Sequence, residues 1–545
     1  MHGPVGKTLI KMTLPMVAGL LSAVTHNLAD TFFVGRIDPT DDAPLAAMAL
    51  TFPVAMFVGA LTMGLGMGVS TAVARAIGEG NLRRARRLTT DGLGLGVIVV
   101  AVLTAVGLSV MDPVFRLLNA TEELMPMIRE YMTVWFAGMV VIMAVPMLAN
   151  AAVRASGDTV TPSIIMILGA GLNIALDPLM IYGWWGFPRM GIAGAALATV
   201  ISGVFATVAA LYVVGVRKGM LDLKRMYWLR LYDSARRVLH IGAPAAGSML
   251  MYPLTMGVIT RMAIHFGGEA GAGANGAGGR VEGMAMMALW ALSGTMMAFV
   301  GQNHGAGNLA RVSRAITLSY TFSLIWGALC IVVFMLIGES LAPVFNKEPT
   351  LVEYLRAYFW VMPLGYGLRG VAIVTSSTLN ALHRPLLAGG HNMVRMFGLY
   401  IPLGYLGGRM AGIMGLFAGI ALANVIAGVL GWVLVARVLA RQRQAELPAP
   451  ASADHEDAEP PPVGSQEAPT AWPPTPMDDR IVKLEEKVTY LEEAISALNE
   501  VVTELNAAVA RQKKDIRELR EDRTPIDTER SPEEDRPPHW GPPGR

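Results

Sequence analysis

Long apolar stretches fill most of residues 8–438 and limit what this chain can fold into. A hydrocarbon core about 30 Å thick needs about twenty apolar residues per helix, and only helices or closed barrels satisfy their backbone groups inside it. The composition agrees, since 16% of the residues are charged against about 25% in ordinary soluble domains. We therefore predict an all-α membrane protein with twelve transmembrane helices. They lie near residues 8–34, 45–70, 88–110, 126–150, 160–183, 191–215, 238–266, 281–300, 315–338, 352–380, 386–408 and 411–438.

Basic residues predict the orientation of these helices. Arginines and lysines cluster after the second, sixth, eighth and twelfth stretches, whereas the loops between are acidic or nearly uncharged. Cytoplasmic loops carry the excess of basic residues in membrane proteins. We therefore expect a multi-pass protein with both termini cytoplasmic. The first stretch follows two lysines and no small-residue cleavage site, so we interpret it as a retained helix and not a signal peptide.

The chain also repeats itself. Residues 74–87 and 301–314 share the pattern Gly-x-Gly-Asn-Leu followed by basic residues, and Pro15 has a counterpart in Pro244. Six stretches separate the copies, an even number, so both copies have the same orientation in the membrane. The repeat predicts two parallel six-helix lobes, residues 1–220 and 221–443, related by an axis along the membrane normal.

After residue 443 the composition changes abruptly. Residues 444–476 are rich in Pro, Ala and Glu and predict a disordered linker. From Ile481 to Leu519 the apolar residues form heptads with Ile or Val at one core position and Leu at the other, interrupted by Gln512. This pattern favours a two-stranded parallel coiled coil. We expect a coiled coil over 477–521, self-association through 481–519, and a disordered tail over 522–545.

Two acids lie inside apolar stretches, where a charge costs at least about 2.5–3.5 kcal/mol. Asp30 is in the first stretch, and Asp177 follows Asn173 by one helical turn in the fifth. Pro178 leaves the carbonyl of residue 174 free, so this helix offers carboxylate, amide and carbonyl oxygens that suit Na⁺ or a proton. Pro15 has the same effect on residue 11 and predicts a hinge. We expect Asp30, Asn173 and Asp177 to form a cation-coupling site.

Other polar residues are candidates for a substrate cavity. Asn150 and Asn380 end the fourth and tenth stretches, where helix capping is the alternative role. The second half carries buried-looking bases instead of acids, among them Arg261, Arg369 and Arg395. An anionic group on the transported molecule would explain their common sign, although snorkelling to the interface is the alternative for each.

Several functions are excluded or disfavoured. No Walker sequence is present, so ATP is not the driving force, and no nucleophile with a base or His/Cys metal cluster appears. We therefore expect neither an enzyme nor a bound cofactor. The net charge of +2 gives no sign of nucleic acid binding, and the single Cys330 forms no disulfide framework.

The pattern Pro15, Asn27, Asp30 and Phe33-Val34-Gly35, with the loop 300–308 and the doubled twelve-helix layout, resembles the multidrug and toxic compound extrusion (MATE) transporters. The resemblance covers about residues 5–440 and is greatest to the DinF-like branch. It implies a cation site at Asp30, Asn173, Asp177 and Thr199, with inward H⁺ or Na⁺ coupled to export of cationic or amphiphilic compounds. The NorM-like branch has acids in the second lobe, and Tyr252 and Arg369 stand near those positions here.

Residues 477–540 separately resemble SlyX, a small bacterial protein with a heptad helix and a Pro-Pro-His-aromatic tail, here at residues 537–540. The join resembles a gene fusion in a Gram-negative bacterium, so we expect the cell inner membrane. The leading hypothesis is an exporter of amphiphilic, cationic drugs by H⁺ or Na⁺ antiport. The alternative is a flippase for a lipid or lipid-linked saccharide with an anionic head group. A membrane scaffold that displays the coiled coil would not explain the buried acids.

Overall fold

The computed structural model describes residues 3–38, 42–222 and 228–446, and these residues form helices and short connections without a strand. The chain divides into two units, Met1–Ala449 and Pro450–Arg545. All of the described residues belong to the first unit. The predicted linker beyond residue 446, the heptad segment and the tail lie outside the described residues.

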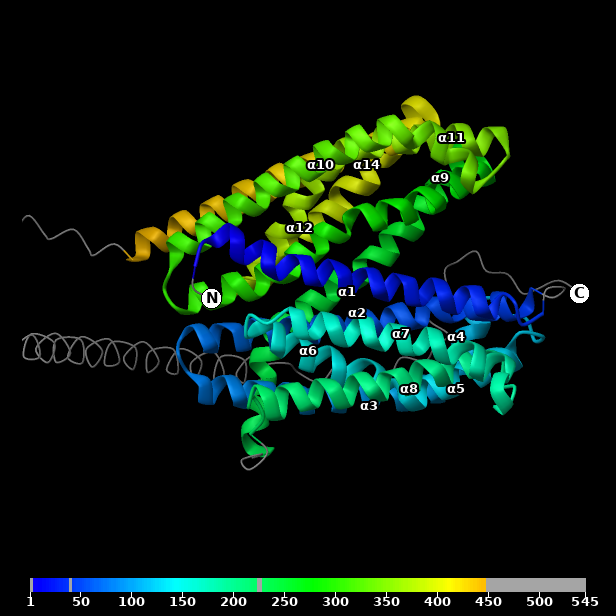
Figure 1. Ribbon diagram of the computed structural model, residues 1–545. Helices are drawn as coiled ribbons and strands as arrows, with labels where there is room; N and C mark the ends of the chain where they lie inside the picture. Colours follow the sequence, from blue (N-terminus) through cyan, green and yellow to red (C-terminus); the bar gives the residue numbers. More distant parts are fainter. Residues whose placement is uncertain (1–2, 39–41, 223–227, 447–545) are drawn as a thin grey trace, which may run out of the picture. The chain divides into compact units, whose positions relative to one another are not determined.

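The first half of this unit consists of helices joined by short turns (Figure 1). Their bounds are α1 Val5–Val34, α2 Ala43–Gly78, α3 Leu82–Ser109, α4 Met111–Leu117, α5 Met125–Met139, η1 Val140–Ala144, α6 Val145–Ala155, α7 Val160–Tyr182, η2 Trp184–Gly186, α8 Gly191–Tyr212 and η3 Val213–Arg217. The fourth predicted stretch is α5, η1 and α6 in succession, with a π-helical turn at η1.

The second half is built from longer helices. Their bounds are α9 Trp228–Gly305, α10 Leu309–Phe345, α11 Pro349–Val361, η5 Met362–Gly365, α12 Tyr366–Ala381, α13 Pro385–Met393, η6 Val394–Tyr400 and α14 Ile401–Glu446. Among the described residues, ten segments are long and apolar enough to cross a membrane.

Two of these ten segments are too long for one crossing. The segment Tyr232–Gly305 has 74 residues and would extend about 110 Å as one straight helix. It breaks at Gly268, which has φ 61° and ψ −157°, and beyond the break Gly271 packs against the backbone of Ala263. The segment Pro385–Gln442 reverses in the same way at Gly412 (φ 59°). Each therefore crosses twice, and the predicted count of twelve passes is confirmed.

The position of the eighth pass differs from the prediction. We placed its start at residue 281, but the helix resumes directly after Gly268. The intervening glycine-rich residues are helical because they pack closely: a side chain at Gly273 would overlap Leu351, and one at Gly278 would overlap Tyr358. Small residues let membrane helices approach one another in this way.

The sequence repeat reappears as repeated backbone geometry. Gly80 and Gly307 have φ values of 72° and 69°. The next residue in each copy, Asn81 or Asn308, caps the following helix by accepting a hydrogen bond from the N–H three residues on, at 2.9 and 3.1 Å. The same turn thus starts α3 in one lobe and α10 in the other.

The two lobes meet chiefly where α2 packs against α9. Side chains at Gly64, Gly68 and Gly78 would overlap Ala246, Val238 and Gln302 of α9, so these backbones are in near contact. Gln302 also donates to the carbonyl of Ala155 at 2.5 Å. The ends of α2, α6 and α9 that adjoin the basic loops are therefore held together.

A prediction concerns the reversal at Gly412. A Cβ at Gly407 would overlap the carbonyl of Gly415, which packs against it across the turn, whereas Gly390 has open space within 4 Å. We expect Gly407→Ala to destabilise the protein by about 1–3 kcal/mol through overpacking and to lower the midpoint of thermal unfolding in detergent. Gly390→Ala is the matched control and should leave the midpoint unchanged or raise it. Equal midpoints for both variants would contradict the close approach.

Candidate functional site

The acid cluster of the first lobe is assembled from three helices. Asp30 comes from α1, Asn173 and Asp177 come from α7, and Thr199 comes from α8. Asn173 and Asp177 are fully buried, and Asp30 is 5% exposed. Asn173 and Asp177 share one face because they are four residues apart on a helix, and this face packs against α1. The structure therefore brings the four predicted residues together.

Asn173 is the centre of this cluster. In the amide orientation that satisfies its surroundings, its nitrogen donates to Asp30 Oδ1 at 2.9 Å and to His26 Nδ1 at 2.9 Å. Its oxygen accepts from the Thr199 N–H at 3.2 Å. His26 Nε2 lies 3.4 Å from Asp30 Oδ2. One amide thus links α1, α7 and α8, and the imidazole of His26 accepts from it at Nδ1.

Asp177 has no such support. Both of its carboxylate oxygens are buried and receive no hydrogen bond from the described residues. The carboxyl group of Asp30 is its direct neighbour. Two carboxylates in contact repel one another unless a proton or a cation lies between them. The arrangement can therefore hold one exchangeable positive charge.

Sequence reasoning missed two members of this cluster. His26 lies one helical turn before Asp30, so the i, i+4 spacing was available as a signal. Tyr131 of α5 is 9% exposed and lies within electrostatic range of both acids. No spacing signal links Tyr131 to them, because it lies on another helix.

The second lobe contains a buried ion pair. Arg369 of α12 donates to Glu282 of α9, and the Tyr358 hydroxyl donates to the other oxygen of Glu282 at 2.8 Å. Arg369 is 7% exposed and Glu282 is 6% exposed. The expectation that this lobe carries bases instead of acids is therefore wrong at this site. Glu282 neutralises Arg369.

Arg395 is different, because no described acid pairs with it. It lies on the π-helical segment η6, with its guanidinium 6.0 Å from the centre of the Tyr400 ring. Its Nε is buried and lacks a hydrogen-bond partner among the described residues. Arg369, Tyr252 and Tyr400 all lie close enough to interact with it electrostatically. The cluster around Glu282 therefore keeps one uncompensated positive charge beside aromatic rings.

The remaining candidates lie apart from both clusters. Arg261 is exposed, so the expectation of a buried base is wrong there. Asn150 lies inside α6, which continues to Ala155, so it does not cap the helix. Asn380 lies one residue before the end of α12. Both asparagines are buried with an unpartnered side-chain oxygen, as far as the described residues show. Helix α1 continues through Pro15, which remains a predicted hinge.

The buried pair gives a testable prediction. We expect Arg369→Leu or Glu282→Leu alone to destabilise the protein by about 3–5 kcal/mol, because each leaves an unpaired buried charge. The double variant should regain most of this loss, since neither charge remains. Thermal unfolding of the four proteins in one detergent forms the double-mutant cycle. Additive losses in the double variant would contradict the pairing.

Comparisons with known proteins agree with this layout. The MatE family model matches residues 15–179 and 244–406, and the SlyX model matches residues 477–540. The FAD transporter of Shewanella oneidensis is 35% identical over 438 residues, covering 80% of this chain and 96% of that protein. The "Probable multidrug resistance protein NorM" of Thermotoga maritima is 28% identical, covering 69% of this chain and 79% of that protein.

Among solved structures, the Vibrio cholerae MATE transporter VcmN in its bent form is 28% identical, with a TM-score of 0.77 over 81% of this chain and 98% of that one. The two family matches fall on the two lobes, and the SlyX match falls on the predicted coiled coil and tail. The chain therefore belongs to the MatE family of transporters and carries a SlyX domain at its C-terminal end.

Proposed function

We propose that this transporter is a cation-coupled exporter in which Asp30, Asn173 and Asp177, with Thr199, form the coupling site. The observation that carries the proposal is the pair of buried carboxyl groups in contact, of which Asp177 has no hydrogen-bond donor among the described residues. Such a pair binds one cation or proton more strongly than a single carboxylate does, because the bound charge also relieves the repulsion between the two acids. Protonation or cation binding then removes a charge whose burial is costly.

The geometry favours H⁺ over Na⁺ as the coupling ion. A sodium site needs several oxygen ligands directed at one point. The Asn173 oxygen instead faces the Thr199 N–H, and its nitrogen faces Asp30 and His26. His26 adds a nitrogen base to the cluster, which suits a proton and not Na⁺. Thr199 acts here through its backbone N–H, as the residue that orients the amide.

For the substrate, we propose an anionic molecule with aromatic rings. Arg395 supplies an unpaired positive charge beside Tyr400, and Tyr252 lies close by. The relative named as an FAD transporter matches this chain over 96% of its own length. Flavin adenine dinucleotide combines a pyrophosphate with two aromatic ring systems. The pyrophosphate would pair with Arg395, and the ring systems would pack against the tyrosines.

The other substrate hypotheses have less support. A cationic drug would be repelled by the uncompensated charge of Arg395 in the second lobe. Because one relative is named for multidrug resistance, the transport assay below includes a cationic drug. The flippase alternative depended on Arg261, Arg369 and Arg395 together. Arg369 is neutralised by Glu282, so a lipid phosphate would find fewer unpaired arginines than that alternative assumed.

The topology and the tail complete the proposal. We infer an inner-membrane protein with both termini cytoplasmic, from the basic loops that adjoin the ends of α2, η3, α9 and α14. We also expect residues 481–519 to self-associate, since the SlyX match covers their heptads.

The proposed coupling site predicts that substrate accumulation driven by a pH gradient depends on both acids. In proteoliposomes, Asp30→Asn and Asp177→Asn should abolish substrate accumulation driven by an imposed pH gradient. Each removes the proton-binding charge but leaves the fold intact, because a buried acid is costly to keep. Glu339→Gln is the matched control, since Glu339 is an exposed acid of α10. Gradient-driven accumulation at the control level in both variants would refute the site.

The same vesicles test the ion and the substrate. A pH gradient should drive wild-type transport, and a Na⁺ gradient at equal pH should not. Flavin adenine dinucleotide should be transported in preference to ethidium. Arg395→Gln should lower flavin transport by about tenfold, the loss of one charge-assisted hydrogen bond of about 1.5 kcal/mol, and Arg395→Lys should restore part of it. Transport of ethidium alone would replace the anionic substrate with a cationic one and leave the coupling site standing.

A further inference from the structure

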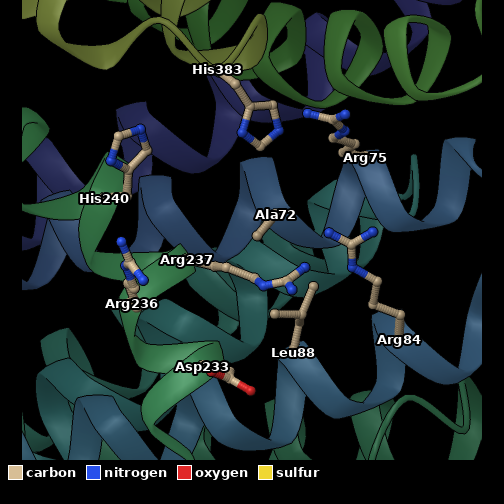
Figure 2. A pocket seen from close by; sticks show the side chains of 9 residues that line it. All are labelled: Ala72, Arg75, Arg84, Leu88, Asp233, Arg236, Arg237, His240 and His383. Carbon is tan, nitrogen blue, oxygen red and sulfur yellow. The ribbon is translucent and has the colours of Figure 1, made fainter. Parts of the chain in front are cut away.

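A second basic site lies between the lobes, away from both clusters described above. It is a cavity of about 410 Å³, within the range of about 300–1,000 Å³ for small-molecule sites. Figure 2 shows the guanidinium groups of Arg84 and Arg237 pointing toward one another across it, with the His383 ring nearby. The lining residues are Ala72, Arg75, Arg84, Leu88, Asp233, Arg236, Arg237, His240 and His383.

The cavity carries a surplus of positive charge. Four arginines line it, and Asp233 is the one acid among the lining residues in the described part of the chain. Glu79 binds Arg75 and Arg84, each at 2.7 Å, and so offsets part of this charge. Arg236 and Arg237 have no ion pair with any described residue at 4 Å or less. With Asp233 and Glu79 counted, four positive and two negative charges leave a surplus of two.

Two buried side-chain nitrogens in the cavity have no partner among the described residues. The Nε of Arg84 and the Nε2 of His383 are buried and lack a hydrogen bond from or to a described residue. Burial, together with Arg75 and His304 nearby, lowers the pKa of His383 to about 4. The imidazole is therefore neutral at physiological pH and remains available to bind. Unsatisfied buried nitrogens beside arginines without an ion pair are the features of an anion-binding site.

The backbone at His383 points to the same role. The turn after α12 holds His383 at φ 57°, a left-handed conformation, whereas the turn after α6 has Gly157 at φ 92° in the equivalent place. A residue with a side chain is strained in this left-handed region, whereas glycine is not. The turn itself would be formed with less strain by glycine, so the imidazole at this position serves the cavity and not the turn.

The cavity is shared by both lobes. Arg75 and Arg84 come from α2 and the start of α3, whereas Arg236, Arg237 and His240 come from α9. His383 comes from the turn between α12 and α13. These elements meet at the basic-loop ends that the α2–α9 contacts hold together. A movement that separates α2 from α9 would divide the site.

We propose that this cavity binds a phosphate-bearing anion from the cytoplasmic side and thereby stabilises the state in which the lobes are joined there. A doubly or triply charged phosphate or pyrophosphate group matches the positive surplus and can accept from several guanidinium groups at once. Because the complete site exists only with the lobes together, such a ligand shifts the population toward this state. The anion thus acts as a regulator that favours closure of the cytoplasmic side.

The test uses inorganic pyrophosphate as the probe and the full chain in nanodiscs of neutral phosphatidylcholine. Calorimetry should show binding to the wild type. Arg236→Gln with Arg237→Gln should weaken it about a hundredfold, since each substitution removes one charge-assisted hydrogen bond and each such loss costs about tenfold in affinity. The matched control is Arg83→Gln with Arg86→Gln, which removes two exposed arginines of α3 that do not line the cavity. Absent wild-type binding, or equal losses in both double variants, would overturn the proposal.

A second measurement tests the link to the closed state. Thr13 of α1 and Thr295 of α9 have hydroxyl oxygens 3.2 Å apart across the lobes. In a Cys330→Ala background, a disulfide between Thr13→Cys and Thr295→Cys should hold the lobes together and keep or raise the affinity for pyrophosphate. Loss of binding on oxidation would show that the site does not belong to this state and would overturn the regulatory role.

The source of the phosphate is distinguished by lipid composition. If an anionic lipid head group is the natural occupant, nanodiscs containing phosphatidylglycerol should weaken pyrophosphate binding to the wild type through competition. If the occupant is a soluble phosphate compound, affinity should differ little between the two lipids at physiological salt. Either result identifies the occupant of the same site.

Discussion

Exclusion of water from the bilayer core is the constraint on which this structure depends. A polar group in the membrane must find its partner within the protein. In the first lobe the amide of Asn173 on α7 is the hydrogen-bond partner of polar groups on two other helices, namely Asp30 and His26 on α1 and the N–H of Thr199 on α8. Asp177 lies beside this network and receives no hydrogen bond from any described residue. The network is therefore satisfied everywhere except at one carboxyl group, and that is where an exchangeable charge has the largest effect.

The two lobes meet the same constraint in different ways. In the second lobe the charge of Arg369 is balanced permanently by Glu282, with Tyr358 satisfying the remaining oxygen. In the first lobe the charges of Asp30 and Asp177 are alike, so a mobile cation or proton has to balance them. The two copies of the duplicated six-helix unit therefore differ in charge, with a like-charged pair of acids in one and a fixed ion pair in the other. Arg395 adds to that pattern an uncompensated charge beside an aromatic ring.

Much of this architecture could be predicted from the sequence, because the bilayer requires a minimum apolar length of each helix that crosses it. The apolar stretches predicted twelve passes, and the four-residue spacing of Asn173 and Asp177 predicted that both side chains lie on the same face of their helix. Glu282 was missed because the predicted eighth stretch began at residue 281, which put this acid at its very end, whereas the helix resumes directly after Gly268 and holds Glu282 in its interior. Its partner Arg369 is 87 residues away, and no local pattern connects them. The cavity of Figure 2 was equally out of reach, since its arginines are ordinary loop-end residues until α2 and α9 meet.

The contacts between the lobes bear on how easily they can separate. At Gly64, Gly68 and Gly78 the backbone of α2 lies directly against α9. Few interdigitated side chains would therefore have to move apart there when the lobes separate. Polar contacts such as that of Gln302 with Ala155 add specific links at the ends of these helices that adjoin the basic loops. Against them stands the mutual repulsion of the arginines in the cavity, which Glu79 and Asp233 offset in part. Attraction and repulsion therefore act at the same interface, and a ligand that binds only where the arginines are together adds to the attraction and shifts the population toward the joined state.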